Sequence, residues 1–180
     1  MATTESEFET ELFGREVNVR YDRTATGYAM VALRLVMGWA LLYPGLNHLT
    51  GMAGFQEATA GMMAGAASTA ANPFAGYFAM LQPYAGVLAW MNALGLTLAG
   101  AALMLGAFVR LAGLAGAVMM LNYWAASLPL AHSIVVDDHV VYALLLFGLG
   151  ALGAGRILGL DAVLEETRLA DLPGARYLLG

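Results

Sequence analysis

The sequence contains neither cysteine nor lysine, and charged residues make up only 12% of the chain. Without cysteine, the chain has no disulfide, no Cys-ligated iron–sulfur cluster and no covalently attached c-type haem. A soluble domain carries about 25% charged residues, whereas this chain is 60% hydrophobic. Any redox role must therefore depend on a bound cofactor, a quinone or a partner subunit.

Hydrophobic residues gather in four stretches, each long enough to cross a hydrocarbon core of about 30 Å. We predict membrane spans at residues 28–48, 84–105, 109–128 and 139–158. The short link Gly106-Ala107-Phe108 forces the second and third spans into an antiparallel hairpin. The first stretch follows a charged segment and is too long for the core of a signal peptide, so we expect it to stay uncleaved.

These spans predict an all-α fold class, a polytopic membrane protein built as a four-transmembrane-helix bundle. The bundle covers residues 28–158, with an acidic segment at 1–27 before it and an amphipathic tail at 159–180 after it. We expect the lipid bilayer as the surroundings. Further copies of the chain or other membrane subunits are the expected partners, and nucleic acid is not.

All eight basic residues are arginines, and their positions predict the orientation in the cell membrane. Seven of them lie before the first span, at the second-to-third connection, or at the end of the fourth span and in the tail: Arg15, Arg20, Arg23, Arg110, Arg156, Arg168 and Arg176. The connections at 49–83 and 129–138 contain no Lys or Arg. Because cytoplasmic flanks are enriched in Lys and Arg, both termini are predicted to be cytoplasmic.

Acidic residues gather in the two tails, and the formal net charge is −5. Acidic tails with arginine but no lysine suit a high-salt cytoplasm, so we hypothesise that the host is a halophilic archaeon. Ordinary lysine use in other proteins of the source organism would contradict this hypothesis.

The first outer connection is long for a bundle and contains an aromatic stretch. Residues 72–81 are predicted to form a short interfacial helix with Pro73 in its first turn. The alternative is a flexible hydrophobic loop. The helix is favoured because an exposed cluster of Phe, Tyr and Met is costly in water.

With this orientation, most of the polar side chains within the spans lie in the outer half of the membrane. They are His48, Asn92, Asn122, Tyr123, Asp138, His139 and Tyr142. Polar groups at such depth usually face the bundle interior or a cavity. This outer cluster is therefore the candidate site.

Most members of the cluster also have a purely structural interpretation. Asp137 or Asp138 caps the fourth helix, and the two asparagines join helices by hydrogen bonds. Tyr123 and Trp124 are interface aromatics, and the histidines are solvated rim residues.

The chemistry of the cluster favours a quinone over a metal or haem. A quinone carbonyl needs a hydrogen-bond donor, and its reduction needs a proton source, which rim His and Asp side chains supply. Haem in a bundle usually needs facing histidines within the spans. A rim metal site made of His48, His139 and Asp138 is a weaker alternative, and we predict no metal.

Arg34 is the one arginine deep inside a predicted span, about 10 Å from its predicted cytoplasmic end. One interpretation is that it snorkels to the inner headgroups. The other is that it holds an anion or a backbone carbonyl inside the bundle.

Two motifs carry a resemblance to a known family. Arg34-Leu35-Val36-Met37-Gly38-Trp39 with Tyr43-Pro44-Gly45-Leu46-Asn47-His48-Leu49, and the Gly-rich stretch from Gly95 to Ala112, resemble the first helix and the second-to-third hairpin of DoxX/DoxD membrane proteins. Asp138 and the stretch Gly148 to Gly155 also fit, so the resemblance covers about residues 28–160. The resemblance implies four membrane helices.

The DoxD branch of that family is similar to a subunit of thiosulfate:quinone oxidoreductase, which oxidises thiosulfate to tetrathionate and passes electrons to a quinone. Other members are linked to redox homeostasis or have no known activity. This chain departs from its relatives at His48, where lysine is common, and at Asn92, where an acid is common.

Our leading hypothesis is a quinone-linked redox subunit. His48, Asp138 and His139 are the candidate catalytic residues, and the candidate quinone-binding residues are Asn92, Asn122, Tyr123, Tyr142 and Arg34. The alternative is a non-catalytic scaffold or accessory subunit of a larger membrane assembly. In that case the polar residues pair among themselves and leave no cavity. A small-solute carrier is a third, weaker hypothesis.

Overall fold

The structure is a computed structural model that describes residues 5–12, 15–167 and 178–179. In chain order its elements are β1 (Glu5–Leu12), β2 (Arg15–Asp22), α1 (Arg23–Thr50), α2 (Met52–Ser68), α3 (Ala75–Leu81), η1 (Gln82–Tyr84), α4 (Ala85–Leu105), α5 (Val109–Ala126), α6 (Asp138–Ala151), η2 (Ala154–Arg156) and α7 (Asp161–Leu164). The predicted helical class is confirmed for the bundle, and the chain is a multi-pass membrane protein.

Three helical stretches within the described residues are long and apolar enough to cross a membrane: Arg23–Thr50, Ala75–Leu105 and Val109–Ala126. The second joins α3, η1 and α4. The fourth predicted span corresponds to α6, which is apolar but shorter.

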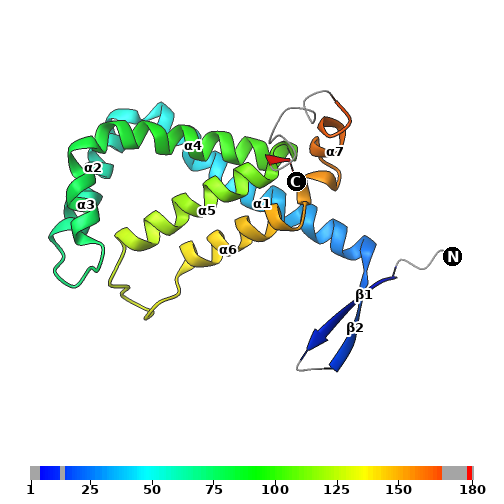
Figure 1. Cartoon of the computed structure of the whole chain (residues 1–180). Coiled ribbons are helices and arrows are strands. Elements are labelled where there is room, and N and C mark those ends of the chain that lie inside the picture. The colour runs from blue at the N-terminus through cyan, green and yellow to red at the C-terminus, as the bar shows by residue number, and fades with distance from the viewer. Residues whose placement is uncertain (1–4, 13–14, 168–177, 180) are drawn as a thin grey trace.

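The long helices form a bundle in which α1 packs along α4 and α5 packs along α6. The α4–α5 link, α7 and the start of α1 lie at one end of the bundle, whereas α2, α3 and the α5–α6 connection lie at the other (Figure 1). The described segments that carry Arg23, Arg110 and Arg156 therefore share one end. Which side of the membrane this end faces stays a prediction.

The N-terminal segment contains an antiparallel hairpin that the sequence analysis did not predict. Strands β1 and β2 pair in a register that places Phe8 opposite Val19 and Glu5 opposite Asp22. More polar and less polar residues alternate through this segment, which is the period of a strand. The hairpin leads directly into α1, whose first turn is capped by Asp22 through the backbone N–H groups of Thr24 and Ala25.

The long connection after α1 is mostly helical. Helix α3 lies within the predicted stretch 72–81, but α2 was not predicted at all. Ala, Met, Gln and Glu, all good helix formers, dominate this segment. Phe78 of α3 is only 2% exposed and packs with Met63, Ala66, Ala85 and Ala125. An interfacial position for α3 stays a prediction.

Glycines let neighbouring helices approach to backbone contact. A Cβ on Gly45 of α1 would lie 2.6 Å from the backbone nitrogen of Thr97 in α4. A Cβ on Gly113 of α5 would lie 2.5 Å from the carbonyl oxygen of Leu146 in α6. Glycine is needed at both positions because no side chain fits between these backbones.

The chain changes direction sharply at the end where the arginines gather. Gly106, with φ of 68°, ends α4, and Phe108, with φ of 53°, precedes α5. Helix α6 ends at Ala151, short of the predicted boundary at 158. Gly153, with φ of 69°, breaks it, and the following residues turn inward toward Arg34.

Candidate functional site

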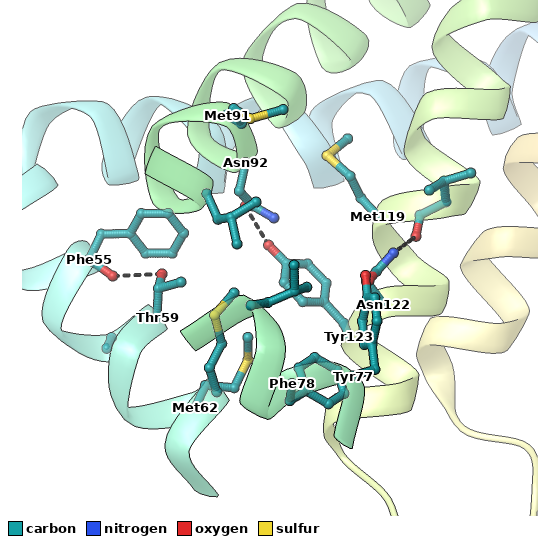
Figure 2. A pocket seen from close by; sticks show the side chains of 15 residues that line it. Phe55, Thr59, Met62, Tyr77, Phe78, Met91, Asn92, Met119, Asn122 and Tyr123 are labelled. Atoms are coloured by element: carbon teal, nitrogen blue, oxygen red, sulfur yellow. Dashed lines mark hydrogen bonds between the residues drawn. The ribbon is translucent and has the colours of Figure 1, made fainter. Parts of the chain in front are cut away.

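A cavity of about 530 Å³ lies where α2 and α3 meet α4 and α5 (Figure 2). Its lining residues are Phe55, Ala58, Thr59, Met62, Met63, Tyr77, Phe78, Leu81, Leu88, Met91, Asn92, Val118, Met119, Asn122 and Tyr123. Most of these side chains are apolar, and four are methionines, which adapt to irregular ligands. None is acidic, basic or histidine.

Two asparagines line this cavity, and they differ in how they are bonded. Asn122 accepts a hydrogen bond from the Tyr77 hydroxyl at 2.8 Å and donates to the Val118 carbonyl at 2.9 Å. Asn92 accepts from the Tyr123 hydroxyl at 2.6 Å. Its amide nitrogen has no hydrogen-bond partner among the described residues, and Figure 2 shows it among the lining side chains.

A second cavity, of about 340 Å³, lies beside the first. It is lined by Ala40, Leu41, Pro44, His48, Phe55, Met62, Leu96, Met120, Tyr123, Ser127, His139 and Tyr142. Phe55, Met62 and Tyr123 line both cavities and form the wall between them. Two predicted catalytic histidines therefore meet in the smaller cavity, and the two asparagines meet in the larger one.

His139 is hydrogen-bonded to Asp137, the residue that caps its helix. Its Nδ1 lies 2.8 Å from Oδ2 of Asp137, whose Oδ1 accepts from the backbone N–H of Val140 at 3.1 Å. Burial raises the pKa of Asp137, but the hydrogen bonds from His139 and Val140 outweigh it and leave this pKa below its usual value. Asp137 is thus an ionised cap and the partner of a histidine.

Asp138 lies outside both cavities, whereas His48 lines the smaller one. The Asp138 side chain is 67% exposed, has Oδ1 3.4 Å from Nδ1 of His139, and lines neither cavity. The His48 ring stacks on Phe55 with 3.7 Å between ring centroids, so α1 and α2 meet at the smaller cavity.

The described residues contain one group with the ligand types of a metal site, Asp137, Asp138 and His139. Asp137 is already used in capping α6 and bonding His139. The alternative metal site considered from the sequence, His48 with His139 and Asp138, is a different set, because His48 is not part of this group.

Arg34 lies away from both cavities, near the α4–α5 link. It is 2% exposed, and its guanidinium donates to the carbonyl oxygens of Ala154 at 2.6 Å and of Ile157 and Leu158 at 3.0 Å. Holding backbone carbonyls was one of the two interpretations of this residue. The other interpretation, snorkelling to the headgroups, does not fit a guanidinium that is buried and bonded to these carbonyls.

Asp161 is the buried acid that sequence reasoning missed. Its carboxylate accepts from the backbone N–H groups of Phe108 and Val109, at 2.6 and 3.0 Å, and its charge acts on Arg34. Its own N–H donates to the carbonyl of Gly106 at 2.8 Å. The sequence signal was weak, because Asp161 follows the spans and resembled part of an acidic tail.

The cavity wall supplied by α2 and α3 was also missed. Phe55, Thr59, Met62 and Phe78 belong to a connection that the sequence analysis placed outside the site. The only available signal was the richness of that connection in methionine and aromatic residues.

The sequence model of the DoxX family matches residues 29–133, more than half of the chain. The chain belongs to the DoxX family. The DoxX match runs from α1 to the α5–α6 connection and so contains most of the cavity wall, but it ends before His139 and Tyr142. No curated protein and no solved structure matches the sequence.

Proposed function

We propose that this DoxX protein is a quinone-linked redox subunit, and that the quinone ring lies in the larger cavity. The observation that carries the proposal is the amide nitrogen of Asn92, a donor without a partner among the described residues, in a cavity with largely apolar walls. A quinone carbonyl is a matching acceptor.

The size and setting of the cavity support the same ligand class. Pockets for small organic molecules measure about 300–1,000 Å³ and combine apolar walls with a few polar groups. This cavity measures about 530 Å³. Met91 and Val118, which line it, are 63% and 51% exposed on the outside of α4 and α5. This exposure supports entry of a lipid-soluble ligand from the bilayer.

The reaction takes two electrons and two protons to convert the quinone to a quinol. The DoxD resemblance supports a sulfur oxyanion as the donor: two thiosulfate ions give up two electrons as the S–S bond of tetrathionate forms. The chain has no cysteine to carry these electrons. A partner subunit or the bound donor itself therefore delivers them.

The cavity also bears on the scaffold alternative. That hypothesis expects paired polar groups and no cavity. Asn122 fits it, since both ends of its amide are bonded. Asn92 and the open volume beside it do not, so the quinone hypothesis is preferred.

Equilibrium binding of a quinone analogue to the purified protein tests the proposal. Asn92→Leu is expected to weaken binding about tenfold, the worth of one hydrogen bond of roughly 1.4 kcal/mol. Asn122→Leu is expected to weaken it less, because this amide is already bonded within the protein.

The matched control is Asn47→Leu, the same change at an exposed residue of α1 that lines neither cavity. It is expected to leave the affinity unchanged. Absence of binding by the unmodified protein, in both detergent and native lipid, would remove the proposal.

A further inference from the structure

The larger cavity has no strong proton donor of its own. Its lining contains no acid, no histidine and no arginine. A quinone bound there needs two protons, so they must come from outside this cavity. The neighbouring cavity is the one lined by histidines, and the two cavities share a wall.

Within the smaller cavity, His139 is the histidine with an ionised partner. Asp137 Oδ2 lies 2.8 Å from His139 Nδ1, and a carboxylate only accepts hydrogen bonds. Nδ1 therefore carries a hydrogen, and the proton that His139 gains and loses is the one on Nε2. The second oxygen of Asp137 is fixed by the start of α6, so the pair is held rigidly.

Tyr123 connects this pair to the larger cavity. Its ring meets the ring of His139 edge-on, with 5.7 Å between centroids and 61° between planes. Its hydroxyl lies on the other side of the wall, where it donates to Asn92 at 2.6 Å. One side chain thus touches the histidine and the proposed quinone-binding amide.

The other polar groups around His139 are few. Asp138 Oδ1 lies 3.4 Å from the same Nδ1, whereas Tyr142 of α6 and His48 of α1 line the same cavity. Asp138 is mostly exposed, while the side chain of Asp137 is 17% exposed. The less exposed acid makes the shorter contact.

We propose that His139 is the proton donor of the quinone site, that Asp137 positions it, and that Tyr123 passes the proton between the two cavities. This inference rests on the proposed function. The Tyr123 hydroxyl gives its proton to a quinone oxygen, the Nε2–H bond of protonated His139 breaks as His139 reprotonates Tyr123, and a proton from water at this end of the bundle restores protonated His139. Two such transfers accompany two electrons from the sulfur-oxyanion donor.

The first measurement is the tautomer of His139, read from nitrogen-15 NMR of the ring in the full-length protein. In the unmodified protein neutral His139 is expected to carry its hydrogen on Nδ1. Asp137→Asn keeps a good helix cap but offers an N–H to the ring, so the hydrogen is expected to move to Nε2. An unchanged tautomer would overturn the positioning role of Asp137.

The second measurement is the rate at which an electrode reduces a quinone analogue bound to the protein in lipid films. Asp137→Asn, His139→Gln and Tyr123→Phe are each expected to slow quinol formation about tenfold or more at neutral pH, within the range for general acids. The affinity of the Asp137→Asn and His139→Gln variants for the analogue is expected to stay within about threefold. Glu57→Gln, which removes an exposed carboxylate of α2 at the same end, is the control.

The outcomes separate this inference from the proposed function. Normal rates in the three variants with normal binding would overturn the inference and leave the quinone site standing. A loss in Asp138→Asn but not in Asp137→Asn would overturn the role of Asp137. If the unmodified protein binds no analogue, the proposed function and this inference fall together.

Discussion

Arg34 is a charged side chain inside an apolar bundle, and its surroundings explain why the chain tolerates it. A buried charge is stable only when it is paired and hydrogen-bonded. The guanidinium receives both, from three carbonyl oxygens of the 154–158 segment and from the nearby charge of Asp161. The hydrogen bonds from Arg34 therefore hold the segment after α6 against α1.

Replacing Arg34 tests this role. Arg34→Met is expected to lower the free energy of unfolding by about 3 kcal/mol, because three carbonyls and a buried carboxylate lose their cation. Equilibrium unfolding in mixed detergent micelles measures the loss.

The control is an arginine at the same end of the bundle. Arg156 is 46% exposed and donates to the carboxylate of Glu165, which raises the pKa of Arg156. Arg156→Met is expected to cost less than about 1 kcal/mol. Equal losses in the two variants would contradict a special role for Arg34.

At the scale of elements, the contact between α5 and α6 depends on backbone proximity. Gly113 faces the carbonyl of Leu146, and a Cβ on Gly150 would lie 3.2 Å from the Cα of Arg110. This contact fixes α6, and with it the position of His139 beside Tyr123. The site therefore depends on small residues that are far from it.

Two Gly→Ala substitutions separate packing from helix propensity. Gly113→Ala is expected to destabilise the protein by about 1–3 kcal/mol, because its Cβ collides with backbone. Gly148→Ala, in α6, has open space around it and is expected to stabilise the helix by up to about 1 kcal/mol. Thermal unfolding of the two variants in the same detergent measures both changes. A similar change in unfolding temperature for both variants would show that α5 and α6 move apart at little cost in free energy.

For the whole molecule, the arrangement of the ends makes the predicted topology testable. The α4–α5 link and α7 share one end, and the α5–α6 connection lies at the other. Because the chain has no cysteine, single introduced cysteines report their own position without background.

His132→Cys in the α5–α6 connection and Glu166→Cys after α7 are both exposed positions. A membrane-impermeant thiol reagent added to intact cells is expected to label His132→Cys only. Glu166→Cys is expected to react only after the membrane is opened. Labelling of Glu166→Cys in intact cells would reverse the predicted orientation.

Part of the candidate site was predictable from sequence and part was not. Asn92, Asn122, Tyr123, His139 and Tyr142 line the two cavities as a group placed by depth alone. That worked because helix length converts position in the sequence into depth. Which of Asp137 and Asp138 makes the shorter contact with His139 was not predictable, since neighbouring residues lie at the same depth and differ only in the direction of their side chains.

The membrane helices, the tight α4–α5 link and the family could be predicted from the sequence, because apolar length, glycine and short motifs act locally. The tertiary structure determines which polar groups have partners. It paired Arg34 with carbonyls more than a hundred positions away, buried Asp161, and folded α2 and α3 over the cavity. Such pairings depend on how separate helices pack, which no local pattern records.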